Sequence, residues 1–194
     1  MAVRRQWHDA WTEPAVADDH ALVRLAQANA AAFGDLYRRY LDPVYRYCSR
    51  QLDQTAAEDV TSIVFLKALQ AIGSFDPDRA TFRSWLFTIA HHAIIDQHRV
   101  RTHLPIDEIE RSATGPSVEE ISVHGDQMRH LRAALRTLPA DQQAVINLRL
   151  ADLTGVEIAA VLEKPPGTVR VLQHRAVQTL KRLLSEPEWS TDHD

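Results

Sequence analysis

The stretch that decides the fold runs from Asp152 to Leu184 and reads DLTGVEIAAVLEKPPGTVRVLQHRAVQTLKRLL. Thr154 and Glu157 have the spacing of a capping box, which marks the start of a helix. Pro165 and Pro166 end that helix, because proline has no backbone N–H to donate, and Pro166 suits the first turn of a following helix. The stretch therefore predicts two helices joined by a tight turn.

The second of these helices has two different faces. Apolar residues recur on one side at intervals of three or four: Val169, Leu172, Ala176, Leu180 and Leu183. Basic side chains occupy the other side: Arg170, His174, Arg175, Lys181 and Arg182. A helix with a basic outer face after a tight turn is typical of a DNA-binding helix-turn-helix. An ordinary helical hairpin with a solvated basic face gives the same pattern, so the rest of the chain must decide.

Composition excludes several classes of protein. The chain has 194 residues, 45% of them hydrophobic and only six glycines, which suits two small helical domains. It has no apolar run long enough to span a bilayer, and its first residues lack the apolar core of a secretory signal. The single cysteine, Cys48, cannot form an internal disulfide. We therefore expect a cytoplasmic protein without membrane insertion.

The net charge of −4 hides an uneven distribution. Residues 102–127 carry one basic and six acidic side chains, and the tail 186–194 is also acidic. Residues 129–184 carry nine basic and four acidic side chains. The local field decides whether a segment attracts a polyanion, so the C-terminal part remains a candidate for binding nucleic acid.

Helical periodicity also dominates the N-terminal half. We expect a helical stretch from Leu22 to Gln51 with interruptions at Asn29 and Asp42-Pro43, a helix from Ala56 to Ile72 capped by Thr55, and another from Thr81 to Val100. The predicted fold class is all-α, with two small helical domains joined by an extended acidic linker. The expected parts are a flexible arm (1–21), a helical domain (22–101), the linker (102–127), the helix-turn-helix domain (128–185) and the acidic tail (186–194).

Five stretches carry a resemblance to a known family: AAFGDLYRRY (31–40), AAEDVTSIVFLKAL (56–69), FDPDRATFRSWLFTIAHHAIIDQHR (75–99), LRTLPADQQAVINLRL (135–150) and GVEIAAVLEKPPGTVR (155–170). In these stretches the chain resembles the extracytoplasmic-function (ECF) sigma factors, bacterial RNA polymerase subunits that keep only regions 2 and 4. The resemblance implies binding to core polymerase, recognition of the −10 and −35 promoter elements, DNA melting and transcription initiation. It implies no enzymatic activity and no cofactor.

The resemblance places the −35 contacts at the start of the second helix of the helix-turn-helix. The candidates are Thr168, Arg170, Val171, His174 and Arg175. Arginine pairs with guanine through two hydrogen bonds, whereas valine offers an apolar surface to a thymine methyl. Arg149 and Lys164 are expected to contact phosphate, which positions the protein without reading sequence.

The resemblance also implies that the loop Phe75–Thr81 captures a flipped −10 base, with the following helix as the wall of its pocket. The candidates are Phe75, Asp78, Arg79, Thr81, Trp85, His91, His92 and Arg99. His92 stands where the family usually has asparagine, and core packing is an alternative role for Trp85. His92 and Asp96 have the spacing of two metal ligands, but the neighbouring histidines do not converge with them, so we expect no metal.

The expected polymerase-binding residues are Asp59, Val60, Ser62, Ile63 and Leu66, and Ile63 could equally pack in the core. The expected partners are core RNA polymerase, through its clamp helices and flap, promoter DNA and, where one exists, an anti-sigma factor. A second interpretation is a stand-alone helix-turn-helix regulator whose N-terminal helical domain dimerises or senses a ligand. A third is a degenerate family member that acts only as an interaction module, because Ser62, Ile63, His91 and Leu172 depart from the family pattern.

Overall fold

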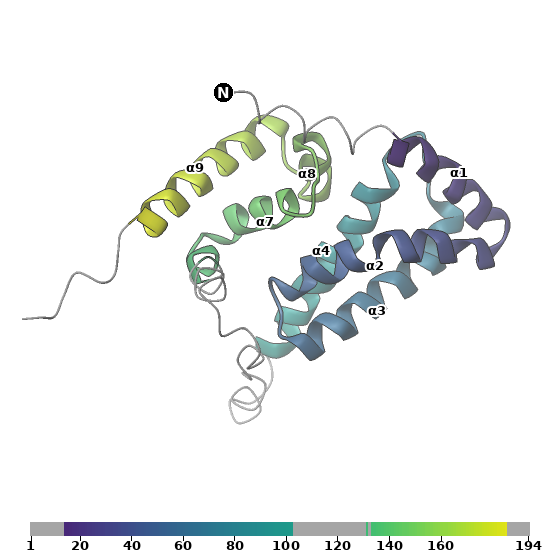
Figure 1. The fold of residues 1–194 in the computed structure, drawn as a ribbon, viewed down its shortest axis with the longest axis horizontal. Helices are drawn as coiled ribbons and strands as arrows, with labels where there is room; N and C mark the ends of the chain where they lie inside the picture. Colours follow the sequence, from purple (N-terminus) through teal and green to yellow (C-terminus); the bar gives the residue numbers. More distant parts are fainter. Residues whose placement is uncertain (1–13, 103–130, 132, 186–194) are drawn as a thin grey trace, which may run out of the picture. The chain divides into compact units, whose positions relative to one another are not determined.

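A computed structural model describes residues 14–102, 131 and 133–185. All regular secondary structure in this part of the chain is helical, which confirms the predicted all-α class (Figure 1). The chain divides into two compact units, residues 1–103 and 104–194. The expected linker and acidic tail lie outside the described residues, except for the linker's first residue.

Each unit is built from a small number of helices. The first contains α1 (Pro14–Ala28), the 3₁₀ turn η1 (Ala30–Ala32), α2 (Phe33–Ser49), α3 (Gln54–Ala71), the 3₁₀ turn η2 (Ile72–Ser74) and α4 (Phe82–Thr102). The second contains α7 (Ala140–Arg149), α8 (Gly155–Val161) and α9 (Pro166–Ser185), and residues 133–136 are also helical.

The helix α1 begins within the segment expected to be a flexible arm. It starts at Pro14, whereas the arm was predicted to extend to residue 21. Asp19 is only 4% exposed, accepts a hydrogen bond from Arg39 Nη1 at 2.6 Å and accepts another from the Tyr40 hydroxyl. Burial, together with the Asp19 carboxylate, raises the pKa of Tyr40. These contacts with α2 fix a segment whose own sequence has little apolar periodicity, which is why the sequence prediction was wrong there.

Two further local predictions were wrong. Pro43 lies inside α2 and does not interrupt it. Its missing backbone donor costs the helix free energy, but Tyr40, Val44 and Tyr47 are buried on both sides of it and hold the helix by packing. The N-cap of α3 is Asp53, whose Oδ1 accepts from the Ala56 amide at 2.9 Å, so Thr55 does not cap the helix.

The core of the first unit lies between α2, α3 and α4. Its fully buried members include Tyr47 from α2, Val64 from α3 and Phe87 from α4, and the Tyr47 and Phe87 rings meet edge to face with centroids 5.3 Å apart. Cys48 is also buried there, and burial raises the pKa of its thiol to about 11. At neutral pH the thiol stays protonated, so packing is its role.

The second unit buries one face of each of its labelled helices. Val145 and Leu148 from α7, Ile158 from α8, Val169 from α9 and Leu153 from the intervening turn are at most 1% exposed. A neighbouring cluster of Leu135, Leu138, Ile146 and Ala176 extends this core along α9. The apolar face predicted for α9 therefore points inward at Val169 and Ala176.

The predicted capping box at the start of α8 is confirmed. Thr154 Oγ1 accepts from the Glu157 amide at 3.3 Å, and Glu157 Oε2 accepts from the Thr154 amide at 2.8 Å. Asp152 adopts the left-handed backbone conformation, with φ of 62°, in the turn before α8. The helix-turn-helix thus begins where its sequence indicates.

The Thr154 cap gives a stability prediction. Thr154→Ala should destabilise the protein by about 1 kcal/mol, because the Glu157 amide loses its acceptor. Urea unfolding followed by circular dichroism measures the change. Thr154→Ser is the control, since it keeps the hydroxyl acceptor. If Thr154→Ala is as stable as Thr154→Ser, the cap contributes nothing to stability.

Candidate nucleic-acid and partner interfaces

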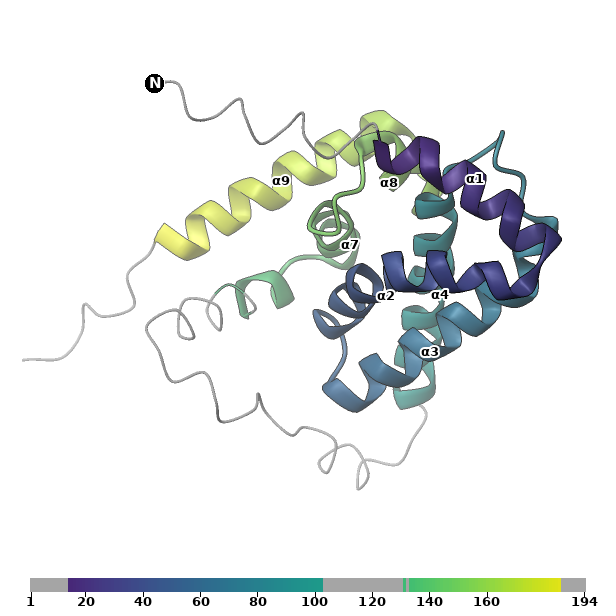
Figure 2. The same cartoon turned by 45° about the vertical axis from the view of Figure 1, so that its right-hand side comes forward.

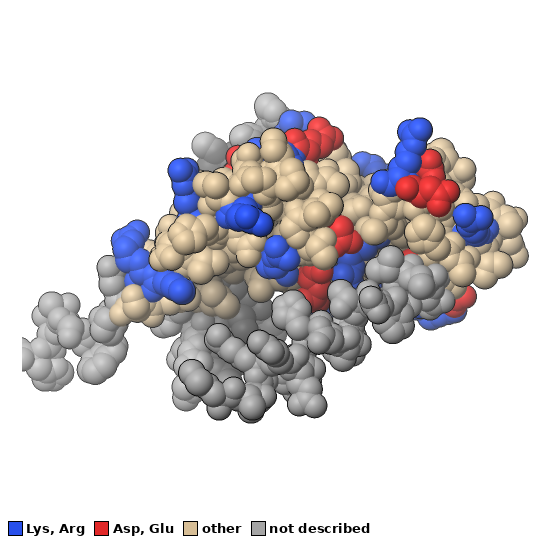
Figure 3. Space-filling view, turned by 90° about the horizontal axis from the view of Figure 1, so that it is seen from above, with Lys and Arg blue, Asp and Glu red and all other residues tan. Residues whose placement is uncertain are grey.

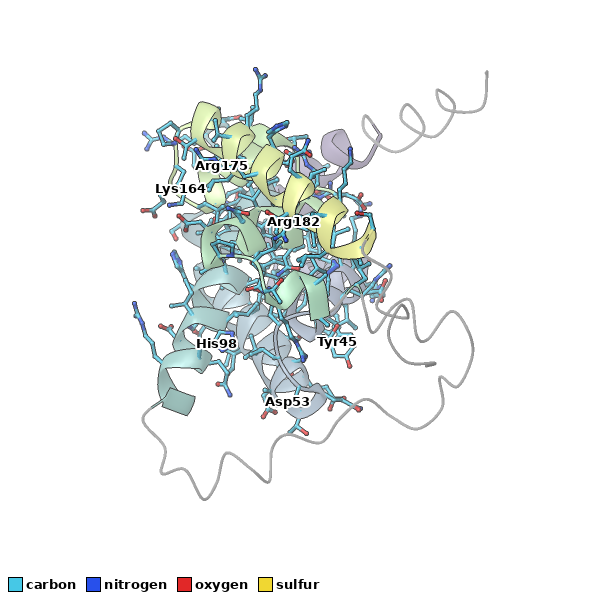
Figure 4. All side chains as sticks on the ribbon, turned by 90° about the vertical axis from the view of Figure 1, so that its left-hand side faces the viewer. Tyr45, Asp53, His98, Lys164, Arg175 and Arg182 are labelled. Carbon is cyan, nitrogen blue, oxygen red and sulfur yellow. The ribbon has the colours of Figure 1, made fainter. Side chains whose placement is uncertain are left out.

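The outer face of α9 is a polar and basic surface. Thr168, Arg170, Val171, His174 and Arg175 are all exposed, with Val171 at 48%. Figure 3 shows Lys and Arg side chains spaced along α9, and Figure 4 labels Arg175 and Arg182 on this helix. All five −35 candidates therefore lie on the solvent side of a helix whose opposite side is buried.

Arg149 and Lys164, the two expected phosphate contacts, are engaged within the second unit. Lys164, labelled in Figure 4, forms an ion pair with Asp141 at 3.0 Å. Arg149 Nη1 donates to the Leu153 carbonyl at 2.8 Å, and its Nη2 donates to Gln173 Oε1 at 3.1 Å. Arg149 thus ties α7 to the turn and to α9. No sequence pattern indicates this contact, because Arg149 and Gln173 are 24 positions apart.

Phe75 and Trp85 belong to an aromatic cluster at the start of α4. Phe75 is 7% exposed, and its ring lies 4.7 Å from that of Trp85 and 6.1 Å from that of Phe82. Phe82 in turn lies 5.3 Å from Tyr40 of α2. Phe75 therefore anchors the loop to the core, whereas the half-buried Trp85 leaves part of its ring accessible.

The tip of the loop holds its shape by local contacts. The Asp76 carboxylate accepts from the Asp78 amide at 3.0 Å and pairs with Arg79 at 3.2 Å. Asp78 and Arg79 are exposed. Thr81 ends the loop as a cap of α4, with its Oγ1 accepting from the Ser84 amide at 3.1 Å. The exposed candidates in this loop are thus the side chains of Asp78 and Arg79.

The two adjacent histidines of α4 lie in different surroundings. A hydrogen bond of 3.2 Å joins His91 Nδ1 and the Tyr47 hydroxyl, whose pKa burial raises. His92 is exposed, and Arg99 pairs with Asp96 at 3.7 Å on the outside of the helix. His91 therefore joins α4 to α2, while His92 and Arg99 face solvent. Across the described residues, no group of three side chains could hold a metal ion.

The expected polymerase-binding residues of α3 separate into an outer and an inner set. Val60 is 1% exposed and packs in the core, so it offers no surface to a partner. Asp59 and Ser62 are exposed, Ile63 is 41% exposed and Leu66 is 56% exposed. Ile63 is therefore not a core residue in this structure.

Two further apolar residues near this surface were missed by the sequence reasoning. Leu69 on α3 is 39% exposed, and Tyr37 on α2 is 40% exposed. The Tyr37 ring meets that of Phe65 on α3 with centroids 4.7 Å apart. The spacing of Ile63, Leu66 and Leu69 could have indicated a continuous strip on α3, but no sequence signal places Tyr37 beside that helix.

Comparison with known families matches both units. Residues 36–103 match the model of Sigma-70 region 2, and residues 128–180 match that of Sigma-70 region 4. The ECF RNA polymerase sigma factor BldN of Streptomyces coelicolor is 40% identical over 189 residues, which cover 89% of this chain and 70% of that protein. The sigma factor SigD of Mycobacterium tuberculosis is 30% identical, over 71% of this chain and 70% of that protein.

Two solved structures align with this chain. CnrH, in complex with the cytosolic domain of CnrY, aligns with a TM-score of 0.66 and 27% identity over 86% of this chain and 96% of that chain. The sigma factor RpoE of Bartonella quintana, in complex with the anti-sigma factor NepR, aligns with a TM-score of 0.62 and 25% identity over 78% of this chain and 96% of that chain.

A region 2 unit and a region 4 unit with a helix-turn-helix define a DNA-binding transcription initiation factor. The chain belongs to the ECF RNA polymerase sigma factors. Within the described residues, no helix is both long and apolar enough to cross a membrane.

Proposed function

We propose that this chain directs core RNA polymerase to promoters by reading the −35 element with α9 and capturing a flipped −10 base beside α4. The observation that carries the proposal is the two-sided character of α9. Val169 and Ala176 anchor the helix in the core, while the −35 candidates face outward at its N-terminal end. A helix fixed in this way can enter a major groove without losing its own packing.

The −35 element is read by a combination of charged and apolar side chains. Arg170 and Arg175 each present a guanidinium that can pair with guanine O6 and N7, and Val171 presents methyl groups to thymine. His174 lies between them on the exposed face. The hydrogen bond from Arg149 to Gln173 holds α9 on the rest of the unit. Arg149 therefore acts by positioning α9 rather than by contacting phosphate.

The −10 element is opened by capture of one base in the loop beside α4. Unstacking a base costs a few kcal/mol, which contact with aromatic and polar groups offsets. The half-buried Trp85 and the exposed Asp78, Arg79 and His92 supply such groups, and Arg99 lies further along the same helix. Phe75, Thr81 and His91 support this surface from inside through packing, capping and the bond to Tyr47.

Core polymerase binds the exposed strip of α3. Ile63 and Leu66 supply apolar contact area, and Asp59 and Ser62 supply the polar edge. The clamp helices and the flap are the proposed contact sites on the polymerase. An anti-sigma factor is a further proposed partner, because the sigma factor RpoE in one of the similar structures is bound to the anti-sigma factor NepR.

A DNA-binding experiment separates this function from that of a stand-alone regulator. The purified chain alone should bind promoter duplex weakly, and addition of core polymerase should produce a specific complex. Tight specific binding by the chain alone would contradict the proposal and support the regulator.

His92 gives a prediction about base choice. Neutral imidazole offers one donor and one acceptor on opposite sides of the ring, whereas the asparagine amide offers both in one plane. His92→Asn should therefore change the rank order of transcription on four templates that differ only at the flipped base, with unchanged affinity for polymerase. His98→Asn, an exposed change on the same helix, is the control. An unchanged rank order would place base choice in the loop 75–81 instead.

A further inference from the structure

Gln27 of α1 makes two hydrogen bonds to the backbone that leads into the base-capturing loop. Its Nε2 donates to the Ile72 carbonyl at 3.0 Å and to the Phe75 carbonyl at 2.7 Å. Both acceptors are carbonyl oxygens, so the amide can face them only with its nitrogen. The contact therefore uses both N–H groups of one side chain to bridge η2 and the first residue of the loop.

This bridge adds a contact from α1 to the first end of the loop, where Phe75 ends η2 and its amide donates to the Ile72 carbonyl at 3.1 Å. At the other end, Thr81 caps α4 by accepting from the Ser84 amide. At the N-terminal end of the loop, the Phe75 ring packs against Trp85, and the Phe75 carbonyl accepts a hydrogen bond from Gln27. The tip between them is held by contacts within the loop itself, from Asp76 to Asp78 and Arg79.

The bridge comes from an element outside the helices that form the proposed interfaces. The helix α1 packs against α2, η2 and α4, and Figure 2 shows it beside the segment that leads into α4. Gln27 itself is exposed and makes no contribution to the apolar core. Changing it should therefore alter the position of the loop without unfolding the unit.

We propose that Gln27 is a positioning residue for −10 base capture, which sets the path of residues 72–75 and so the placement of Asp78 and Arg79. The inference rests on the proposed function, because it assigns Gln27 a part in the same base capture. It predicts that loss of the two donors reduces discrimination between bases at the flipped position more than it reduces polymerase affinity or thermal stability.

Gln27→Glu is the sharpest test, because it keeps the size of the side chain but replaces both N–H donors with an oxygen that repels the carbonyls. Gln27→Lys should restore function in part, since an ammonium group again offers donors. Asn29→Asp is the matched control. It makes the same change from amide to carboxylate two residues away, but keeps the oxygen that accepts from the Ala31 amide.

The measurement is run-off transcription with core polymerase on four templates that differ only at the flipped base, together with polymerase affinity and thermal unfolding for each variant. Gln27→Glu should lower transcription from the preferred template by about tenfold, the loss expected from two ordinary hydrogen bonds. The ratio between the best and the worst template should fall toward one, while Asn29→Asp retains the wild-type ratio and polymerase affinity stays constant.

Three results would overturn the inference. An equal loss on all four templates would show that Gln27 only stabilises the fold, and wild-type behaviour of Gln27→Glu would show that the bridge has no role. The proposed function would survive both results, because the wild-type protein would still discriminate between templates. A wild-type protein without any base preference would instead overturn base capture itself and the inference with it.

Discussion

Replacing Arg170 with alanine should weaken use of a matched −35 element by about 1–3 kcal/mol, the free energy of one bidentate contact with a base. Arg170 is exposed near the start of α9, next to the buried Val169, so its removal should leave the core of the unit intact. The loss should be greatest on the preferred promoter and should disappear when the contacted base pair is changed. Transcription with core polymerase from a set of promoters substituted singly across the −35 element measures this pattern.

Arg136→Ala is the matched control for Arg170→Ala. Arg136 is an exposed arginine of the same unit that lies outside α9, so its removal changes the net charge equally. It should produce at most a small loss, uniform across promoters. An equally uniform loss for Arg170→Ala would show that Arg170 contacts phosphate and reads no base.

Replacing Leu66 with aspartate should weaken binding to core polymerase by about 2–4 kcal/mol, the range of a residue that dominates an interface. Leu66 is 56% exposed on α3 with Ile63 one turn before it, so a carboxylate there would be buried without a partner in the complex. Competition with labelled wild-type protein for core polymerase measures the change. Folding should be preserved, because the side chain makes little contribution to the core.

Leu25→Asp provides a close control for the polymerase surface. Leu25 is a leucine of the same unit, 57% exposed on α1, and the substitution introduces the same charge. It should leave polymerase affinity unchanged. If both leucine variants bind polymerase as the wild type does, the strip on α3 is not the interface.

The sequence predicted the helix-turn-helix because its signals are local. The capping box at Thr154 and Glu157 and the proline pair at 165–166 each depend on residues within one or two turns. Periodicity also placed Val169 and Ala176 on the buried side of α9, which left the −35 candidates on the exposed side. Such features need no contact with a distant residue, so they can be predicted from the chain alone.

Features that depend on contacts between distant residues could not be predicted. The early start of α1 depends on Asp19 meeting Arg39 and Tyr40, and the continuity of α2 through Pro43 depends on packing around it. The cap of α3 was predicted at Thr55, and only the geometry of the Ala56 amide assigns it to Asp53.

The candidate site shows the same division between local and long-range signals. Val60 and Phe75 were expected at interfaces, but each is buried, because a helix or loop segment with apolar residues on several sides does not reveal which side faces the core. The bridges from Arg149 to Gln173 and from Gln27 to Phe75 join residues 24 and 48 positions apart, and no periodicity connects such pairs.

Run-off transcription with purified core polymerase and a library of promoters tests the central claim most directly. The account predicts that polymerase initiates at defined positions only when this chain is present, and that the selected promoters share two elements spaced for region 2 and region 4. Absence of any chain-dependent transcript, together with tight specific binding of the chain alone to duplex DNA, would contradict it.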